Sequence, residues 1–158
     1  MKHLHIILAF MSLLLLLLTA CSAKSETVQE KDVVVEIIKK YYDLEKEDDY
    51  VAKIVCDHSV SRPVLIDLGF SSDTADFYDQ AYYESHALVA IVMKAGVSNT
   101  FSLESMKADN KELNVRLNKK IPAYVDDMLV NRGILVEVSK DDIDQMEDVK
   151  VSIHTRKE

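Results

Sequence analysis

An acid–histidine pair, Asp57-His58, is the first place where the sequence offers groups for catalysis or metal binding. A metal site needs several ligands that converge on one ion, and His86 and His154 are the further candidates. Nothing in the spacing of these histidines brings them together with His58. The two serines that follow the pair are explained by a turn, because neighbours in sequence do not form a catalytic triad. We therefore predict no catalytic residue, no metal ligand and no cofactor, and we expect a protein that is not an enzyme.

A second acidic cluster, Asp141-Asp142-Ile143-Asp144, is similar to the start of a calcium-binding loop. It lacks the alternating oxygen ligands, the central glycine and the closing glutamate of such a loop, so we interpret it as helix capping after Ser139. The sequence also contains no glycine-rich phosphate-binding motif and no zinc-protease or serine-hydrolase signature. A cell-wall hydrolase remains an alternative that rests on export alone.

Cys21 is the residue to which the sequence assigns a definite chemical fate. A charged start at Lys2 precedes the apolar run 6–18, whose 13 residues are fewer than the about 20 that a membrane span needs. The run ends in Leu18-Thr19-Ala20-Cys21, which resembles the bacterial lipobox at all four positions. We predict signal-peptide cleavage between Ala20 and Cys21 and attachment of a diacylglyceryl group to the Cys21 thiol. The alternatives are an ordinary secreted protein and an uncleaved anchor helix.

The lipid on Cys21 predicts where the mature chain is located. Two acyl chains hold a protein firmly on a membrane, at about 0.8 kcal/mol per buried methylene. We therefore expect residues 1–20 to be a lipoprotein signal peptide, residues 21–30 a lipidated tether, and residues 31–158 a single α+β domain. This domain is expected at the extracytoplasmic face of the cell membrane of a Gram-positive bacterium, anchored through Cys21.

Composition limits the partners of the mature chain. About 138 residues remain after cleavage, which is the size of one domain with its own core. Cys56 is then the only other cysteine, and we interpret it as a small buried hydrophobe. The formal net charge of −8 disfavours nucleic acid and anionic lipid as partners, and it favours cationic ligands or simple solubility.

The first half of the mature chain contains both helical and strand patterns. A helix over 31–47 is predicted from a capping box at Thr27–Glu30 and helical apolar spacing, with a strand beginning at Val33-Val34-Val35 as the alternative. The further predicted segments are a strand at 50–56, a turn at 59–63, a short strand at 64–68, a helix capped at Ser71 and running to Tyr82, and a buried strand at 88–93.

The second half alternates between apolar and polar residues, which is typical of half-buried strands. The predicted strands are 101–103, 113–117, 134–138 and 149–153, with a turn at 108–110 and one helical turn after Ser139. Together these patterns predict an α+β fold, in which a small and mostly antiparallel sheet is packed against one or two N-terminal helices. The irregular stretch from Lys119 to Gly133 is the expected partner-binding loop.

The order of these segments is similar to a domain of exported Gram-positive proteins, the C-terminal domain of the protease-complex subunit PrcB. The resemblance spans residues 64–153 and is carried by six segments, 82–89, 96–100, 113–117, Ile121-Pro122, Asp127-Met128 and 134–142. The chain departs from the family at Gly96-Val97-Ser98, where a Ser-Gly-Ser-like turn is usual, and at 129–131, where an aromatic residue is usual. The resemblance implies a small β-rich domain with an accessory role, and it carries no catalytic residues to this chain.

Three functional hypotheses follow from these features. The first is a lipid-anchored accessory protein that binds a protein partner, such as an exported protease. The second is an immunity lipoprotein that sequesters a cationic antimicrobial peptide. The third is the cell-wall hydrolase.

Overall fold

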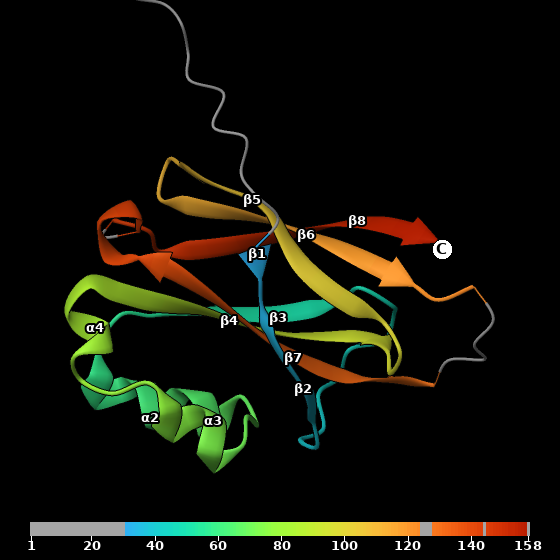
Figure 1. Ribbon diagram of the computed structural model, residues 1–158, viewed down its shortest axis with the longest axis horizontal. Helices are drawn as coiled ribbons and strands as arrows, with labels where there is room; N and C mark the ends of the chain where they lie inside the picture. The colour runs from blue at the N-terminus through green and yellow to red at the C-terminus, as the bar shows by residue number, and fades with distance from the viewer. Residues whose placement is uncertain (1–30, 124–127, 144, 158) are drawn as a thin grey trace, which may run out of the picture.

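Two four-stranded sheets face each other, and a layer of short helices covers the outer side of one of them (Figure 1). The structure is a computed structural model that describes residues 31–123, 128–143 and 145–157. The sheets are mostly antiparallel, so the predicted α+β class is confirmed. The strands of the second half, which we expected in a single sheet, are divided between the two.

Sheet A has the strand order β1-β5-β6-β8 and sheet B the order β2-β7-β4-β3. The strands of sheet A are β1 (Lys31–Asp32), β5 (Thr100–Asp109), β6 (Glu112–Ile121) and β8 (Asp148–Lys157). Those of sheet B are β2 (Val34–Ile38), β3 (Tyr50–Val55), β4 (His86–Gly96) and β7 (Leu129–Ser139). The helical segments are α2 (His58–Asp67), α3 (Ser72–Phe77), α4 (Tyr82–Ser85) and the 3₁₀ turn η1 (Lys140–Asp142). All described strand pairs are antiparallel except β6 with β8.

Strand β4 lies at the centre of the fold because both of its faces are buried. Its residues Leu88 to Met93 are fully inaccessible to solvent, which confirms the predicted buried strand. Val89, Ile91 and Met93 pack into the core between the sheets, whereas Leu88, Ala90 and Val92 pack against the helices. An unbroken apolar run is thus the sequence signature of a strand covered on both sides.

Both cores draw their residues from within the described part of the chain. The core between the sheets and the core under the helices lie between Val33 and Ile153. A chain that starts at Ser22 therefore contains every described residue of both cores. We refer to this version, which lacks Cys21 and everything before it, as the soluble chain.

The helix predicted for 31–47 is wrong, and the strand alternative at Val33-Val34-Val35 is the observed structure. Residues 34–38 pair with β7 through the register Val34–Leu135 to Ile38–Asn131. Four of these five residues are β-branched, and such side chains pack well on a pleated surface while losing rotamer freedom in a helix. Pairing with β7 therefore outweighs the helical spacing, and residues 39–49 form no helix or strand.

The predicted turn at 59–63 and strand at 64–68 are also wrong, because helix α2 occupies this segment. Asp57 is its N-cap, with the carboxylate accepting the amide of Ser59 at 2.7 Å. Leu65 and Leu68, three residues apart, point from one helical face onto sheet B and are fully buried. Helix capping and this apolar pair outweigh the presence of Pro63 inside the helix.

The predicted cap at Ser71 is confirmed, although the helix after it is shorter than expected. The Ser71 hydroxyl accepts the amide of Thr74 at 3.2 Å and begins α3. The helix ends at Tyr78, whose backbone is extended, and α4 follows as a separate turn. The turn predicted at 108–110 is the hairpin between β5 and β6, where Asn110 and Lys111 both have positive φ.

Lys119 is a buried lysine that pairs with two carboxylates from a distant segment of the chain. The Lys119 side chain on β6 is 2% exposed and donates to Glu47 Oε1 at 2.9 Å and to Asp48 Oδ1 at 2.7 Å. Burial lowers the pKa of the Lys119 ammonium, but the hydrogen bonds to the two carboxylates outweigh burial and raise the pKa above its usual value. Lys119 therefore attaches the irregular segment before β3 to sheet A.

Replacing Lys119 with methionine is expected to lower the free energy of unfolding by about 1–3 kcal/mol at neutral pH. The two carboxylates are partly solvated, so the loss is smaller than for a fully buried pair. The pKa of the Lys119 ammonium is higher in the folded protein than in the unfolded chain, where it is about 10.4. The stabilisation by Lys119 is therefore complete below about pH 10.4, and it disappears as the pH rises through the pKa of the folded protein. Urea unfolding of both proteins should give a constant difference from pH 6 to 9 that shrinks above pH 10.5. A difference that shrinks between pH 6 and 9 would contradict this assignment.

Candidate binding sites

An apolar groove lies between strand β2 and helix α3. Its volume is about 320 Å³, and its lining residues are Val34, Asp73, Thr74, Phe77 and Tyr78. Phe77 is 76% exposed and Val34 is 42% exposed, which is unusual for large apolar side chains at neighbouring positions. Tyr78 forms the buried floor, and burial raises the pKa of its phenol, so the hydroxyl stays protonated and can donate to Glu137.

A carboxylate from β2 fixes the relative position of the two walls of this groove. Glu36 Oε1 accepts the amide of Ser71 at 2.7 Å, and Glu36 Oε2 accepts the Thr74 hydroxyl, also at 2.7 Å. These bonds join the strand to the first turn of α3, where negative charge is favourable. The groove is therefore preformed rather than dependent on a mobile side chain.

Strand β2 is an edge strand along the same side of the molecule. It pairs with β7 alone among the described strands, so no other described strand uses the backbone donors and acceptors of its second edge. Exposed edges of this kind are templates for an additional extended segment. The groove thus combines apolar side chains with an open row of hydrogen-bonding groups.

The helical segment that supplies one wall of the groove is acidic overall. The segment 57–85, which contains α2, α3 and α4, has six acidic residues and one basic residue, Arg62. The Arg62 guanidinium is already paired with Asp76 at 2.7 Å. A ligand that fits here is therefore an extended segment with an apolar side chain and positive charge nearby.

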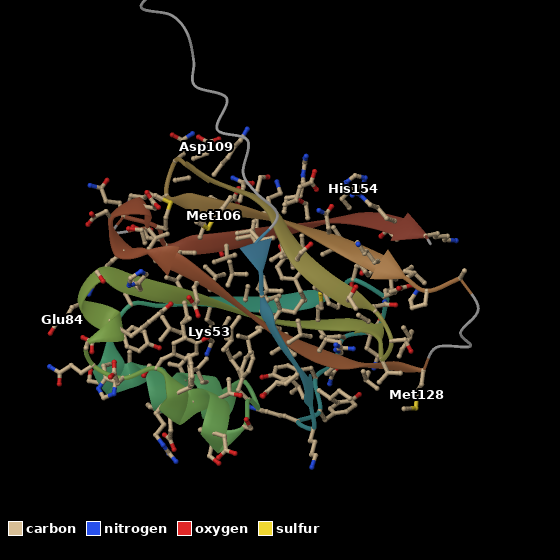
Figure 2. All side chains as sticks on the ribbon, viewed as in Figure 1. Lys53, Glu84, Met106, Asp109, Met128 and His154 are labelled. Atoms are coloured by element: carbon tan, nitrogen blue, oxygen red, sulfur yellow. The ribbon has the colours of Figure 1, made fainter. Side chains whose placement is uncertain are left out.

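A second, polar pocket lies at the other end of the helical layer. Its volume is about 380 Å³, and its lining residues are Cys56, Asp57, His58, Ser59, Gln80, Tyr83, Glu84 and Lys140. Figure 2 shows Glu84 on α4 at this end of the molecule. Lys140 donates to the carbonyl of Tyr83 at 3.1 Å and so attaches η1 to α4.

The acid–histidine pair of the sequence lies in this pocket, but its acid has a structural role. Asp57 caps α2, and its hydrogen bonds to Ser59, helped by the nearby charge of Lys140, lower the pKa of the carboxyl group. The His58 ring lies against Tyr83, with centroids 6.1 Å apart. Cys56, which we expected to be fully buried, is half-buried, packs against the inter-sheet core and lines the pocket.

The other candidate metal ligands lie apart from this pair. His86 stacks on Tyr82 at the start of β4, and His154 contacts Glu104 on sheet A with 3.3 Å between Nδ1 and Oε2. The part of the chain that the structure describes contains no group of three or more His, Cys, Asp or Glu side chains arranged to hold a metal. Asp141 and Asp142 belong to η1, and Ser139 is its N-cap without a side-chain hydrogen bond. Asp144 is outside the described residues.

The predicted lipidation and cleavage residues, Cys21 and Ala20, lie outside the described residues, so both assignments stay predictions. The expected partner-binding loop from Lys119 to Gly133 is corrected, because β6 extends to Ile121 and β7 begins at Leu129. The pairing of β7 with β4 continues to Leu129, opposite Gly96, so residues that we expected in the loop belong to the sheet.

The groove was missed from the sequence because its walls are 43 positions apart, at Val34 and Phe77. The available signal was Phe77 itself, an aromatic residue directly after Asp76 in an otherwise polar helix. Phe77 could be recognised as part of a groove only if the pairing of β2 with β7 was known, and the sequence pattern does not predict that pairing.

Comparisons with protein-family models, with curated proteins and with solved structures find no match for this chain. The resemblance to the PrcB C-terminal domain therefore stays a prediction. No helix within the described residues is long and apolar enough to cross a membrane.

Proposed function

We propose that this chain is an extracytoplasmic lipoprotein, anchored to the cell membrane through Cys21, with a non-catalytic role in binding a protein partner. The observation that carries the binding role is the apolar groove between Val34 and Phe77 beside the open edge of β2. An extended segment of the partner adds to β2 and places one apolar side chain against Phe77. The anchor keeps this interaction at the membrane surface, where an exported protease is one partner of suitable location.

The acidic helical segment beside the groove supports the alternative role as an immunity lipoprotein. A cationic peptide with one apolar anchor would be attracted by the acids of segment 57–85 and would use the same groove. Titration of the soluble chain with each cationic peptide encoded beside its gene separates the two roles. Saturable binding of such a peptide favours immunity, and binding of a neighbouring exported protein favours the accessory role.

Replacing Phe77 with aspartate is expected to weaken partner binding about 30-fold or more. A central aromatic anchor contributes about 2 kcal/mol to an interface, and the new charge repels a segment docked in the groove. Because Phe77 is mostly exposed, the free energy of unfolding should change by less than about 0.5 kcal/mol. The measurement is photo-crosslinking in intact cells from position 34 of the full-length chain, with and without Phe77→Asp, followed by recovery of the envelope fraction.

The matched control places the crosslinker at Val97, an exposed apolar residue in the turn between β4 and β5. Position 34 should yield a discrete adduct that position 97 does not, and Phe77→Asp should remove nearly all of that adduct. The same set of adducts from both positions would refute a binding role for the groove.

A further inference from the structure

The outer face of sheet A has the opposite charge from the helical layer. Strands β5, β6 and β8 contain seven Lys or Arg residues against four acids, although the whole chain has a net charge of −8. Five of these cations lie on the outer side of the sheet and define a basic face, namely Lys107, Arg116, Lys120, Lys150 and Arg156. The helices cover sheet B on the far side of the sandwich (Figure 1). The acidic helical segment and the basic face therefore lie on opposite sides of the molecule.

The strand register places these cations in neighbouring rows. Lys107 and Lys150 stand on either side of Asn114 in one row, and Arg116 lies between two serines in the next. Since neighbouring strands are about 4.8 Å apart, the Lys107 and Lys150 backbones are about 10 Å apart. Lys120 and Arg156 are direct neighbours two rows further along.

Acidic residues on this side of the sheet gather at its hairpin end. Asp109, Glu112 and Asp148 share the row at the turn between β5 and β6, and Glu104 contacts His154. Figure 2 shows Asp109 at that turn and His154 on the same side of the molecule, away from the helices. Lys107, Arg116 and Lys150 form no ion pair among the described residues, so their charges are available to a ligand.

A small cavity lies at the centre of the basic face. Its volume is about 150 Å³, and it is lined by Ser105, Lys107, Asn114, Arg116 and Ser152. This is on the order of five water volumes, which suits a group of five non-hydrogen atoms such as phosphate. Two cations, two hydroxyls and an amide are the donors that a phosphate oxygen accepts from.

The position of the basic face relative to the anchor points to the source of that phosphate. Strand β1 begins at Lys31, ten residues after Cys21, and it pairs with β5 in sheet A. Ten residues of chain span at most about 35 Å, so a lipid on Cys21 keeps sheet A within that distance of the bilayer. A negatively charged membrane surface attracts basic segments within a Debye length and repels the acidic helical layer.

We propose that the basic face of sheet A lies on the headgroups of anionic phospholipids, with one lipid phosphate in the cavity between Lys107 and Arg116. This orientation turns the helical layer, and with it the groove between Val34 and Phe77, away from the membrane and toward a partner. The inference rests on the proposed function for the anchor that brings the face to the membrane. It replaces the expectation from net charge that anionic lipid repels the domain.

The test uses flotation of the soluble chain with phosphatidylglycerol vesicles and, separately, with phosphatidylcholine vesicles. Binding should be detected with the anionic vesicles alone and should decrease as salt increases. Each Lys or Arg near a charged surface contributes roughly a fivefold factor, so Lys107→Ala with Arg116→Ala should weaken binding about 30-fold. The charge-matched control, Lys39→Ala with Lys46→Ala, changes two exposed lysines outside the basic face and should leave binding to the vesicles unchanged.

Three results would overturn the proposal. These are equal binding to both kinds of vesicle, equal loss in the two double variants, and binding to soluble polyphosphate without binding to vesicles. Thermal unfolding of each variant verifies that it is folded. The soluble chain has no lipid, so absence of vesicle binding refutes this orientation alone, whereas absence of lipid on the full-length chain refutes the anchor.

Discussion

Replacing Gly133 with valine is expected to lower the free energy of unfolding of the soluble chain by about 3 kcal/mol or more. Gly133 lies on β7 and faces the helical layer, where a Cβ atom would come within 2.6 Å of Ile38 Cδ1 and 2.7 Å of Phe70 Cε1. Both neighbours are buried, so neither can move without disturbing the core under the helices. Overpacking of this kind typically costs 1–3 kcal/mol, and the branched side chain adds two further methyl groups.

Urea denaturation provides the measurement for Gly133, and Thr155→Val is the control. Thr155 is an exposed residue of β8, so a valine introduced there contacts solvent instead of a packed core. Gly133→Ala should fall between the wild type and Gly133→Val. Equal stability of the wild type and Gly133→Val would show that β2 and the α2–α3 connection do not pack on β7 as described.

Replacing Cys21 with alanine is expected to remove the palmitate label from the chain and to leave it as an uncleaved precursor. The diacylglyceryl group is attached to the sulfur atom of the Cys21 side chain, which alanine lacks. Attachment of this group precedes cleavage of the signal peptide. Without two acyl chains, each contributing about 0.8 kcal/mol per buried methylene, the mature lipid-anchored form is lost. The measurement is metabolic labelling with palmitate followed by membrane fractionation.

The natural control for this experiment is Cys56→Ala. Cys56 is the other cysteine of the chain, and it lies half-buried against the inter-sheet core. This variant should keep both the label and the membrane location of the wild type. Equal labelling of the wild type and Cys21→Ala would place the lipid elsewhere.

The strands of the second half could be predicted from sequence because each has one apolar face. The alternation at 113–117 and 134–138 matches residues of β6 and β7 that point into the inter-sheet core. The same pattern could not show that these strands belong to different sheets, because alternation identifies the buried face but not the partner strand. The alternation of apolar and polar residues could not predict the parallel pairing of β6 with β8 for the same reason.

The errors lie where local and tertiary preferences conflict. Val34, Ile37 and Ile38 have spacing compatible with a helix, but β7 offers them an antiparallel partner. Val64 to Leu68 resembles a short strand, yet the Asp57 cap and the burial of Leu65 and Leu68 produce a helix. In both segments, packing against residues far along the chain favours the observed structure, and in α2 the local Asp57 cap adds to this packing.

The candidate sites were less accessible to sequence reasoning than the fold. The groove needs Glu36 to hold Ser71 and Thr74, and the basic face needs three strands in register. Net charge alone predicts that the chain avoids anionic lipid, whereas the proposed orientation depends on the separation of charges onto opposite faces, which a sum over residues hides. The predicted lipidation of Cys21 is the opposite case, since a lipobox is a linear motif that the sequence alone displays.

The most direct test of the lipoprotein assignment is the mass of the N-terminal peptide of the mature chain, isolated from cell membranes. The account predicts a peptide that begins at Cys21 and carries a diacylglyceryl group on its sulfur. A mature N-terminus at any other residue, or a membrane-isolated peptide with an unmodified Cys21, would contradict it.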